Sequence, residues 1–140
     1  MKLKKRIIIP LIITVCTAAI ILSLAIAAKD KQEFEIAAGG LYYLFWCKGE
    51  ESADLARERF QKDFDLTDKD MGDLSRLSAE YYFAQSDLSY AAQNGQDDAL
   101  DKLSGISADY MESVGKIIKD EDKLIQWMSD FNNQESTIGN

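Results

Sequence analysis

The aspartates between positions 65 and 73 are the densest set of side chains in this chain that could bind a metal ion. Asp65, Asp68, Asp70 and Asp73 lie within nine residues. A helix-loop-helix calcium site needs acidic side chains at loop positions 1, 3 and 5, glycine at 6 and glutamate at 12. Counted from Asp68, the fifth position is glycine, the sixth aspartate and the twelfth Ala79, so the pattern fails. We expect no metal site here.

Other groups that could do chemistry are scarce. The chain contains no histidine, and most serine or cysteine nucleophiles and most metal sites of helical bundles depend on an imidazole. Gly39 and Gly40 lie in an apolar stretch and lack the following Lys-Ser/Thr pair of a phosphate-binding loop. We therefore expect no catalytic residue and no cofactor, and predict that the chain is not an enzyme.

Aromatic residues are the remaining candidates for recognition. They form two runs: Tyr42, Tyr43, Phe45 and Trp46 in the first, and Tyr81, Tyr82 and Phe83 in the second. Successive helical side chains point about 100° apart, so each run should leave at least one ring partly exposed. We expect Tyr81, Tyr82 and Phe83 to contact a partner protein. Because Tyr and Trp favour the bilayer interface, we expect Tyr42, Tyr43 and Trp46 to rest there. A broad core that leaves tyrosine hydroxyls in water is the alternative.

The elements that must position these residues are helices. Apolar residues spaced by three and four predict a first helix over 41–64 and further amphipathic helices beyond it. Thr67 and Asp70 form a capping-box pattern that starts the second helix, and Asn94-Gly95 is a typical helix end. Asp97 and Asp98 begin the third.

The polar run 119–123 predicts a break before a short fourth helix over 121–131. One unbroken helix through this run is the alternative. Links of about three residues require antiparallel neighbours. The predicted fold class is thus all-α, an N-terminal transmembrane or signal-anchor helix followed by a small antiparallel bundle of three long helices and one short one.

Charge divides the chain into two parts. The first 28 residues hold four basic and no acidic side chains, so the other 112 hold 12 basic and 24 acidic ones, a formal net charge of −12. Such a polyanion repels phosphate backbones and anionic lipids, which argues against nucleic acid binding.

The N-terminus predicts a membrane-directing segment. Residues 7–28 carry no charge and follow a basic cluster, and 22 helical residues span about 33 Å, enough to cross a bilayer. The flanking charges predict a cytoplasmic N-terminus and an extracytoplasmic C-terminal domain. The alternative is a signal peptide cleaved after Ala27, which would leave a secreted or periplasmic protein. The predicted domains are 1–28 as anchor or signal, 29–40 as juxtamembrane linker, 41–131 as bundle and 132–140 as disordered tail.

One cysteine remains outside this N-terminal segment. Cys47 is either a small buried residue or a thiol that links two copies into a homodimer. From all these features we predict a membrane-anchored, extracytoplasmic helical module that binds another protein and is not an enzyme. The alternative is a cleaved helical protein with a binding or chaperone-like role.

Overall fold

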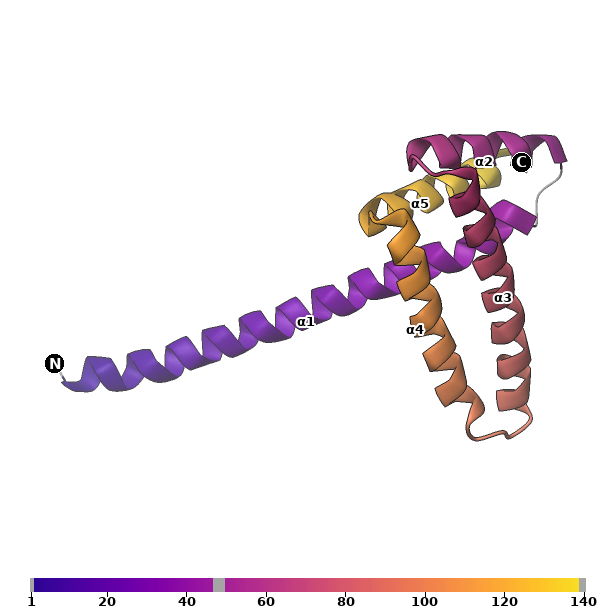
Figure 1. Ribbon diagram of the computed structural model, residues 1–140. Helices are drawn as coiled ribbons and strands as arrows, with labels where there is room; N and C mark the ends of the chain where they lie inside the picture. The colour runs from indigo at the N-terminus through magenta and orange to yellow at the C-terminus, as the bar shows by residue number, and fades with distance from the viewer. Residues whose placement is uncertain (1, 47–49, 139–140) are drawn as a thin grey trace. The chain divides into compact units, whose positions relative to one another are not determined.

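A computed structural model describes the backbone of residues 2–46 and 50–138 and the side chains of 17–46 and 52–134. Every regular element in these residues is helical, which confirms the all-α class. In chain order the helices are α1 (Lys2–Trp46), α2 (Glu50–Asp63), α3 (Asp68–Gln93), α4 (Ala99–Ile118) and α5 (Glu121–Ile138), as Figure 1 shows. Cys47 lies outside the described residues.

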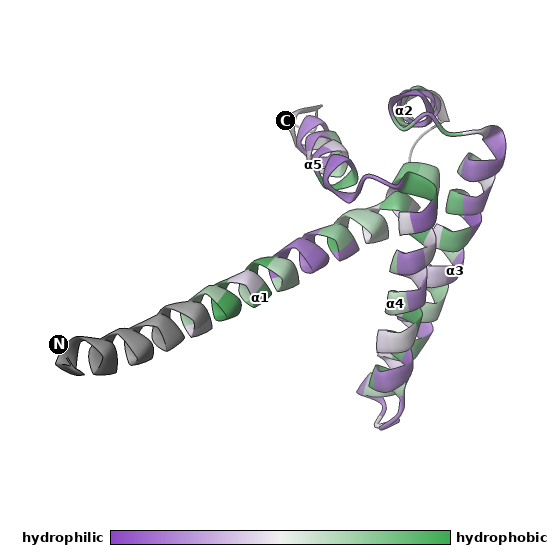
Figure 2. Ribbon diagram, turned by 60° about the vertical axis from the view of Figure 1, so that its left-hand side comes forward, coloured by the Kyte–Doolittle hydropathy of each residue, from purple (hydrophilic) through white to green (hydrophobic). Residues whose placement is uncertain are grey.

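The chain divides into two compact units, Met1–Glu33 and Phe34–Asn140. In the first unit, residues 17–28 are exposed, and a hydrophilic stretch follows them on α1 (Figure 2). Among the side chains that the structure describes, no helix combines the length and the apolar character that a bilayer crossing needs. Residues 7–16 of the predicted anchor lie outside that part of the chain.

The start and the end of α3 confirm two sequence predictions. The backbone N–H of Asp70 donates to Thr67 Oγ1 at 3.1 Å, and the N–H of Thr67 donates to Asp70 Oδ2 at 2.9 Å. This is the predicted capping box, with aspartate in place of glutamate. After α3, Gly95 has φ +82°, a conformation that glycine adopts without steric cost. The chain then reverses, and α4 packs along α3.

The predicted break before the fourth helix is also confirmed. Lys119 ends α4 in the left-handed region with φ 63°, and its N–H donates to the carbonyl of Gly115 at 3.1 Å. α5 begins two residues later, at Glu121. The alternative of one unbroken helix is therefore wrong.

The core of the second unit draws on all five helices. Its largest fully buried side chains are apolar, with one serine among them: Phe60, Leu41, Leu44, Leu74, Leu124, Val114 and Ser78. The ring of Phe60 on α2 contacts two other aromatic rings. The distances between ring centroids are 4.9 Å to Trp127 and 4.7 Å to Phe64. Trp127 Nε1 also donates to Asp63 Oδ2 at 2.9 Å, which joins α5 to the end of α2.

The structure differs from the predicted boundaries at both ends of the bundle. A single helix over 41–64 is wrong, because α1 ends at Trp46 and α2 begins at Glu50. The stretch 29–40, predicted as a linker, is helical, and Phe34, Ala37 and Ala38 within it are buried in the core. At the other end, α5 continues to Ile138, where a fourth helix over 121–131 and a tail were predicted.

Candidate partner-binding surface

The second aromatic run is divided between the core and the surface. Tyr81 is only 7 % exposed, and its ring stacks on Tyr110 of α4 at 4.2 Å with an interplanar angle of 7°. The Tyr110 hydroxyl donates to the carbonyl of Ala38 at 2.6 Å, a buried bond between α4 and α1. Burial raises the pKa of Tyr110 well above its ordinary value, so this hydroxyl keeps its proton. Tyr81 thus belongs to the core.

Tyr82 and Phe83 meet the first aromatic run at the surface. The rings of Tyr42 and Tyr82 are parallel, with centroids 3.8 Å apart. Tyr43 and Phe83 contact Tyr42 edge-on, at 5.9 and 6.2 Å, and Phe83 contacts Tyr82 at 5.7 Å. We call Tyr42, Tyr43, Tyr82 and Phe83 the aromatic surface. Two patches predicted to have separate roles are therefore one continuous patch formed by α1 and α3.

Much of this patch is open to water. Tyr43 is 54 % exposed and Phe83 58 %, while Tyr82 is 37 % exposed. Aromatic pairs contribute about 0.5–1.5 kcal/mol beyond simple burial, so the ring contacts hold these side chains in fixed positions. The prediction that each run leaves a ring exposed is confirmed. The roles assigned to the rings remain predictions.

Trp46 lies apart from the ring contacts of the aromatic surface. Its indole Nε1 donates to the carbonyl of Ser75 on α3 at 3.2 Å, although the side chain is largely exposed. This bond fixes the end of α1 against the first half of α3. An exposed tryptophan with a satisfied N–H is compatible with either an interface or a bilayer surface.

The aspartates at the start of α3 act as helix-capping and ion-pairing groups. Hydrogen bonds from Thr67 lower the pKa of Asp70 below its ordinary value. Lys69 Nζ lies 2.6 Å from Asp73 Oδ2, and this bond raises the pKa of Lys69. In the part of the chain that the structure describes, no three acidic or cysteine side chains gather as metal ligands would.

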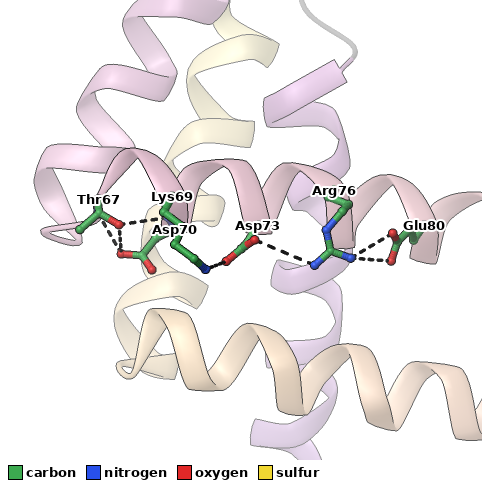
Figure 3. A network of polar contacts seen from close by, with 6 residues as sticks. All are labelled: Thr67, Lys69, Asp70, Asp73, Arg76 and Glu80. Atoms are coloured by element: carbon green, nitrogen blue, oxygen red, sulfur yellow. Dashed lines mark hydrogen bonds and ion pairs between the residues drawn. The ribbon is translucent and has the colours of Figure 1, made fainter.

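Ion pairs continue along the same face of α3, as Figure 3 shows. Arg76 lies 4.0 Å from Asp73 and 3.0 Å from Glu80. Lys69, Asp73, Arg76 and Glu80 thus form a row of alternating charge, with spacings of three and four residues that place them on one side of the helix. Past Glu80, the same side of α3 carries Phe83, Asp87 and Tyr90.

Sequence reasoning predicted Phe83 as a contact residue but missed Asp87 and Tyr90 on the same face. Tyr90 is 71 % exposed, and Asp87 is exposed between it and Phe83. The signal was available, because Tyr90 follows Phe83 by seven residues, a spacing that places both on the same side of a helix. Tyr90 is a lone aromatic in the sequence, however, and only the consecutive runs suggested recognition.

Comparisons with known proteins give no relative for this chain. No protein-family model, no curated protein and no solved structure matches it.

Proposed function

We propose that this chain is a membrane-anchored, extracytoplasmic helical module that binds another protein through its aromatic surface and performs no catalysis. The observation that carries the proposal is the exposure of Tyr43, Tyr82 and Phe83 on a patch whose rings are held by mutual contacts. Tyr, Trp and Phe are enriched where proteins bind one another, because they bury a large area at a low entropic cost.

The packing around Tyr42 supports a role for the patch in recognition. Tyr81, one residue from Tyr82, is buried and supplies packing within the hairpin. The exposed rings of Tyr82 and Phe83 are held in fixed orientations by their contacts with Tyr42. A partner would therefore not have to bear the entropic cost of ordering them.

The proposed anchor has its own support in the first unit. Five large apolar side chains of its described residues are more than half exposed: Ile20, Ile21, Leu22, Leu24 and Ile26. Consecutive apolar side chains exposed in this way are unfavourable in water and favourable in a bilayer. The basic cluster before residue 7 supports an extracytoplasmic position for the bundle.

A cleaved, secreted or periplasmic form is the alternative. The small residues Ala25 and Ala27 favour it, since they form a signal-peptidase pattern. The intact mass of the mature chain, measured together with its distribution between membrane and soluble fractions, distinguishes the two forms. A full-length mass in the membrane fraction supports the anchor, and a mass that begins at Ala28 supports cleavage.

Site-specific photo-crosslinking tests the proposed binding. A photoreactive phenylalanine analogue replaces Phe83 in the full chain, expressed in its native cells. In a matched control the analogue replaces Leu55 of α2, which is 60 % exposed and lies outside the aromatic surface. We expect one recurrent cross-linked species from position 83 that is absent from position 55. Identical products from both positions, or none from position 83, would contradict the proposal.

A further inference from the structure

The outer side of α3 changes character halfway along the helix. Its residues at spacings of three and four are, in order, Lys69, Asp73, Arg76, Glu80, Phe83, Asp87 and Tyr90. The first four alternate in sign and pair with one another. In the second half, Phe83 and Tyr90 occupy the positions where this alternation would place cations.

Asp87 is therefore left between two aromatic rings with no cation beside it on α3. Among the described side chains no ion pair is formed by Asp87, which is exposed. The nearest basic residues along the chain are Arg76, which pairs with Glu80, and Lys102, which pairs with Asp98 at 2.6 Å. An unpaired carboxylate between two exposed rings is complementary to a basic side chain, because rings and carboxylate both attract a cation.

We propose that Phe83, Asp87 and Tyr90 form a docking stripe for a basic helical segment of the partner protein. An arginine or lysine of that segment pairs with Asp87 and lies against the faces of the two rings. The inference rests on the proposed function and identifies the chemistry of its partner.

The charge of the surrounding surface selects this occupant over two others. Residues 77–101 contain five acidic side chains and no basic one. The same stripe on a second copy of the chain would bring carboxylates together, and an anionic lipid headgroup would be repelled in the same way. A basic protein segment is complementary to the negative charge of the stripe and can also cover its aromatic rings.

A first test extends the alternation of positive and negative side chains along α3 to position 83. In Phe83→Lys, the new ammonium group can pair with Asp87 four residues on, as Lys69 pairs with Asp73. We expect the variant to stay folded, with a thermal midpoint a few degrees lower at most, because the new ion pair offsets only part of the lost ring contacts with Tyr42 and Tyr82. The photo-crosslink to the partner, read from position 90, should be lost. An undiminished crosslink in the folded variant would overturn the proposal.

Binding of a defined probe gives a second test. The probe is an alanine-based helical peptide with arginine at every fourth position, carrying a neutral dye, and the control peptide has glutamate in place of arginine. Fluorescence anisotropy is measured with the full chain in nanodiscs of zwitterionic lipid, with empty nanodiscs as background. We expect binding of the arginine peptide alone. We also expect its Kd to rise about threefold in Asp87→Asn and about tenfold in the double variant Phe83→Ala, Tyr90→Ala.

A matched pair on α2 controls for general attraction to an acidic protein. Leu55 and Glu58 are exposed three residues apart, and Leu55→Ala with Glu58→Gln should leave the Kd unchanged. An equal loss in this control, or equal binding of the glutamate peptide, would overturn the proposal. The proposal would also be overturned if the chain bound zwitterionic vesicles through Phe83 and Tyr90 but did not bind the arginine peptide. If position 83 crosslinks to a partner whose contact contains no basic residue, the proposed function survives and this inference fails.

Discussion

The hydrogen bond from Tyr110 to Ala38 allows the packing of α1 on the hairpin to be tested with the loss of a single oxygen atom. Tyr110→Phe keeps the ring that stacks on Tyr81 and removes only the hydroxyl that donates to the Ala38 carbonyl at 2.6 Å. Both partners are buried, Ala38 fully. The substitution therefore isolates a bond that joins α4 to a stretch predicted from sequence as a linker.

The loss of stability expected for Tyr110→Phe depends on whether the Ala38 carbonyl still accepts another hydrogen bond. The carbonyl of Ala38 keeps the backbone bond that a helical carbonyl accepts from the residue four positions on, so it is not left without a donor. Loss of an intramolecular hydrogen bond of this kind costs about 1 kcal/mol. For a unit of this size, that lowers the midpoint of thermal unfolding by about 4 °C.

Fluorescence of the two tryptophans reports this unfolding. Trp46 is bonded to Ser75 and Trp127 to Asp63, so both report the integrity of the second unit. Tyr90→Phe is the matched control, because this largely exposed tyrosine should lose its hydroxyl at almost no cost. If Tyr110→Phe and Tyr90→Phe unfold at the same temperature, the region around Ala38 does not pack on α4 as described.

Three further predictions concern the ends and the interior of α3 and α4. The folded-state pKa of Asp70 lies below its ordinary 3.8, so the stabilising effect of its carboxylate is present above pH 3.8 and is lost as the pH falls through the folded pKa. In urea unfolding measured from pH 6 to pH 2, Asp70→Asn should therefore reduce the loss of unfolding free energy at acid pH. Gly105→Ala, where an added Cβ meets no atom within 4 Å, should stabilise by about 0.5–1 kcal/mol, whereas Gly95→Ala at φ +82° should destabilise by a similar amount. Lys119→Gly should stabilise by about 0.5–1 kcal/mol, because φ 63° is strained for a side chain. Urea unfolding midpoints measure the stability changes of these glycine and lysine variants. A stabilising Gly95→Ala or a destabilising Lys119→Gly would contradict the backbone geometry described for these positions.

Local chemistry allowed the helix ends of the hairpin to be predicted. Thr67 and Asp70 satisfy each other's backbone donors within four residues, and Gly95 follows the helix end in a conformation that few other residues adopt. Such signals need no knowledge of the rest of the fold. The break at Lys119 was found similarly, because the polar run there interrupts the apolar seam.

The helical stretch before residue 41 could not be predicted, because its reason is tertiary. Gly39 and Gly40 disfavour a helix locally, yet at Gly40 an added Cβ would lie 2.8 Å from the Met128 Cε of α5, so this stretch is packed against another helix. The stretch is helical because it packs into the core, where Phe34, Ala37 and Ala38 are buried and Gly40 lies against the flexible end of the Met128 side chain. The break after Trp46 was missed for a related reason, since the apolar spacing continues across it into α2.

The aromatic surface was predicted in part. Exposure of some rings follows from helical geometry alone, and consecutive aromatics draw attention in a sequence. The meeting of Tyr42 with Tyr82 depends on how α1 crosses α3, which periodicity does not encode. The sorting of Tyr81 inward depends on Tyr110, a residue 29 positions away in α4.

The location of the bundle can be measured with a reporter fused after Asn140, one that is active on only one side of the membrane. Binding of an extracytoplasmic partner requires the bundle to lie outside the cytoplasm, joined to the bilayer through residues 7–28. We expect reporter activity outside the cytoplasm and full-length fusion protein in the membrane fraction. Reporter activity in the cytosol would contradict both the location and the proposed role.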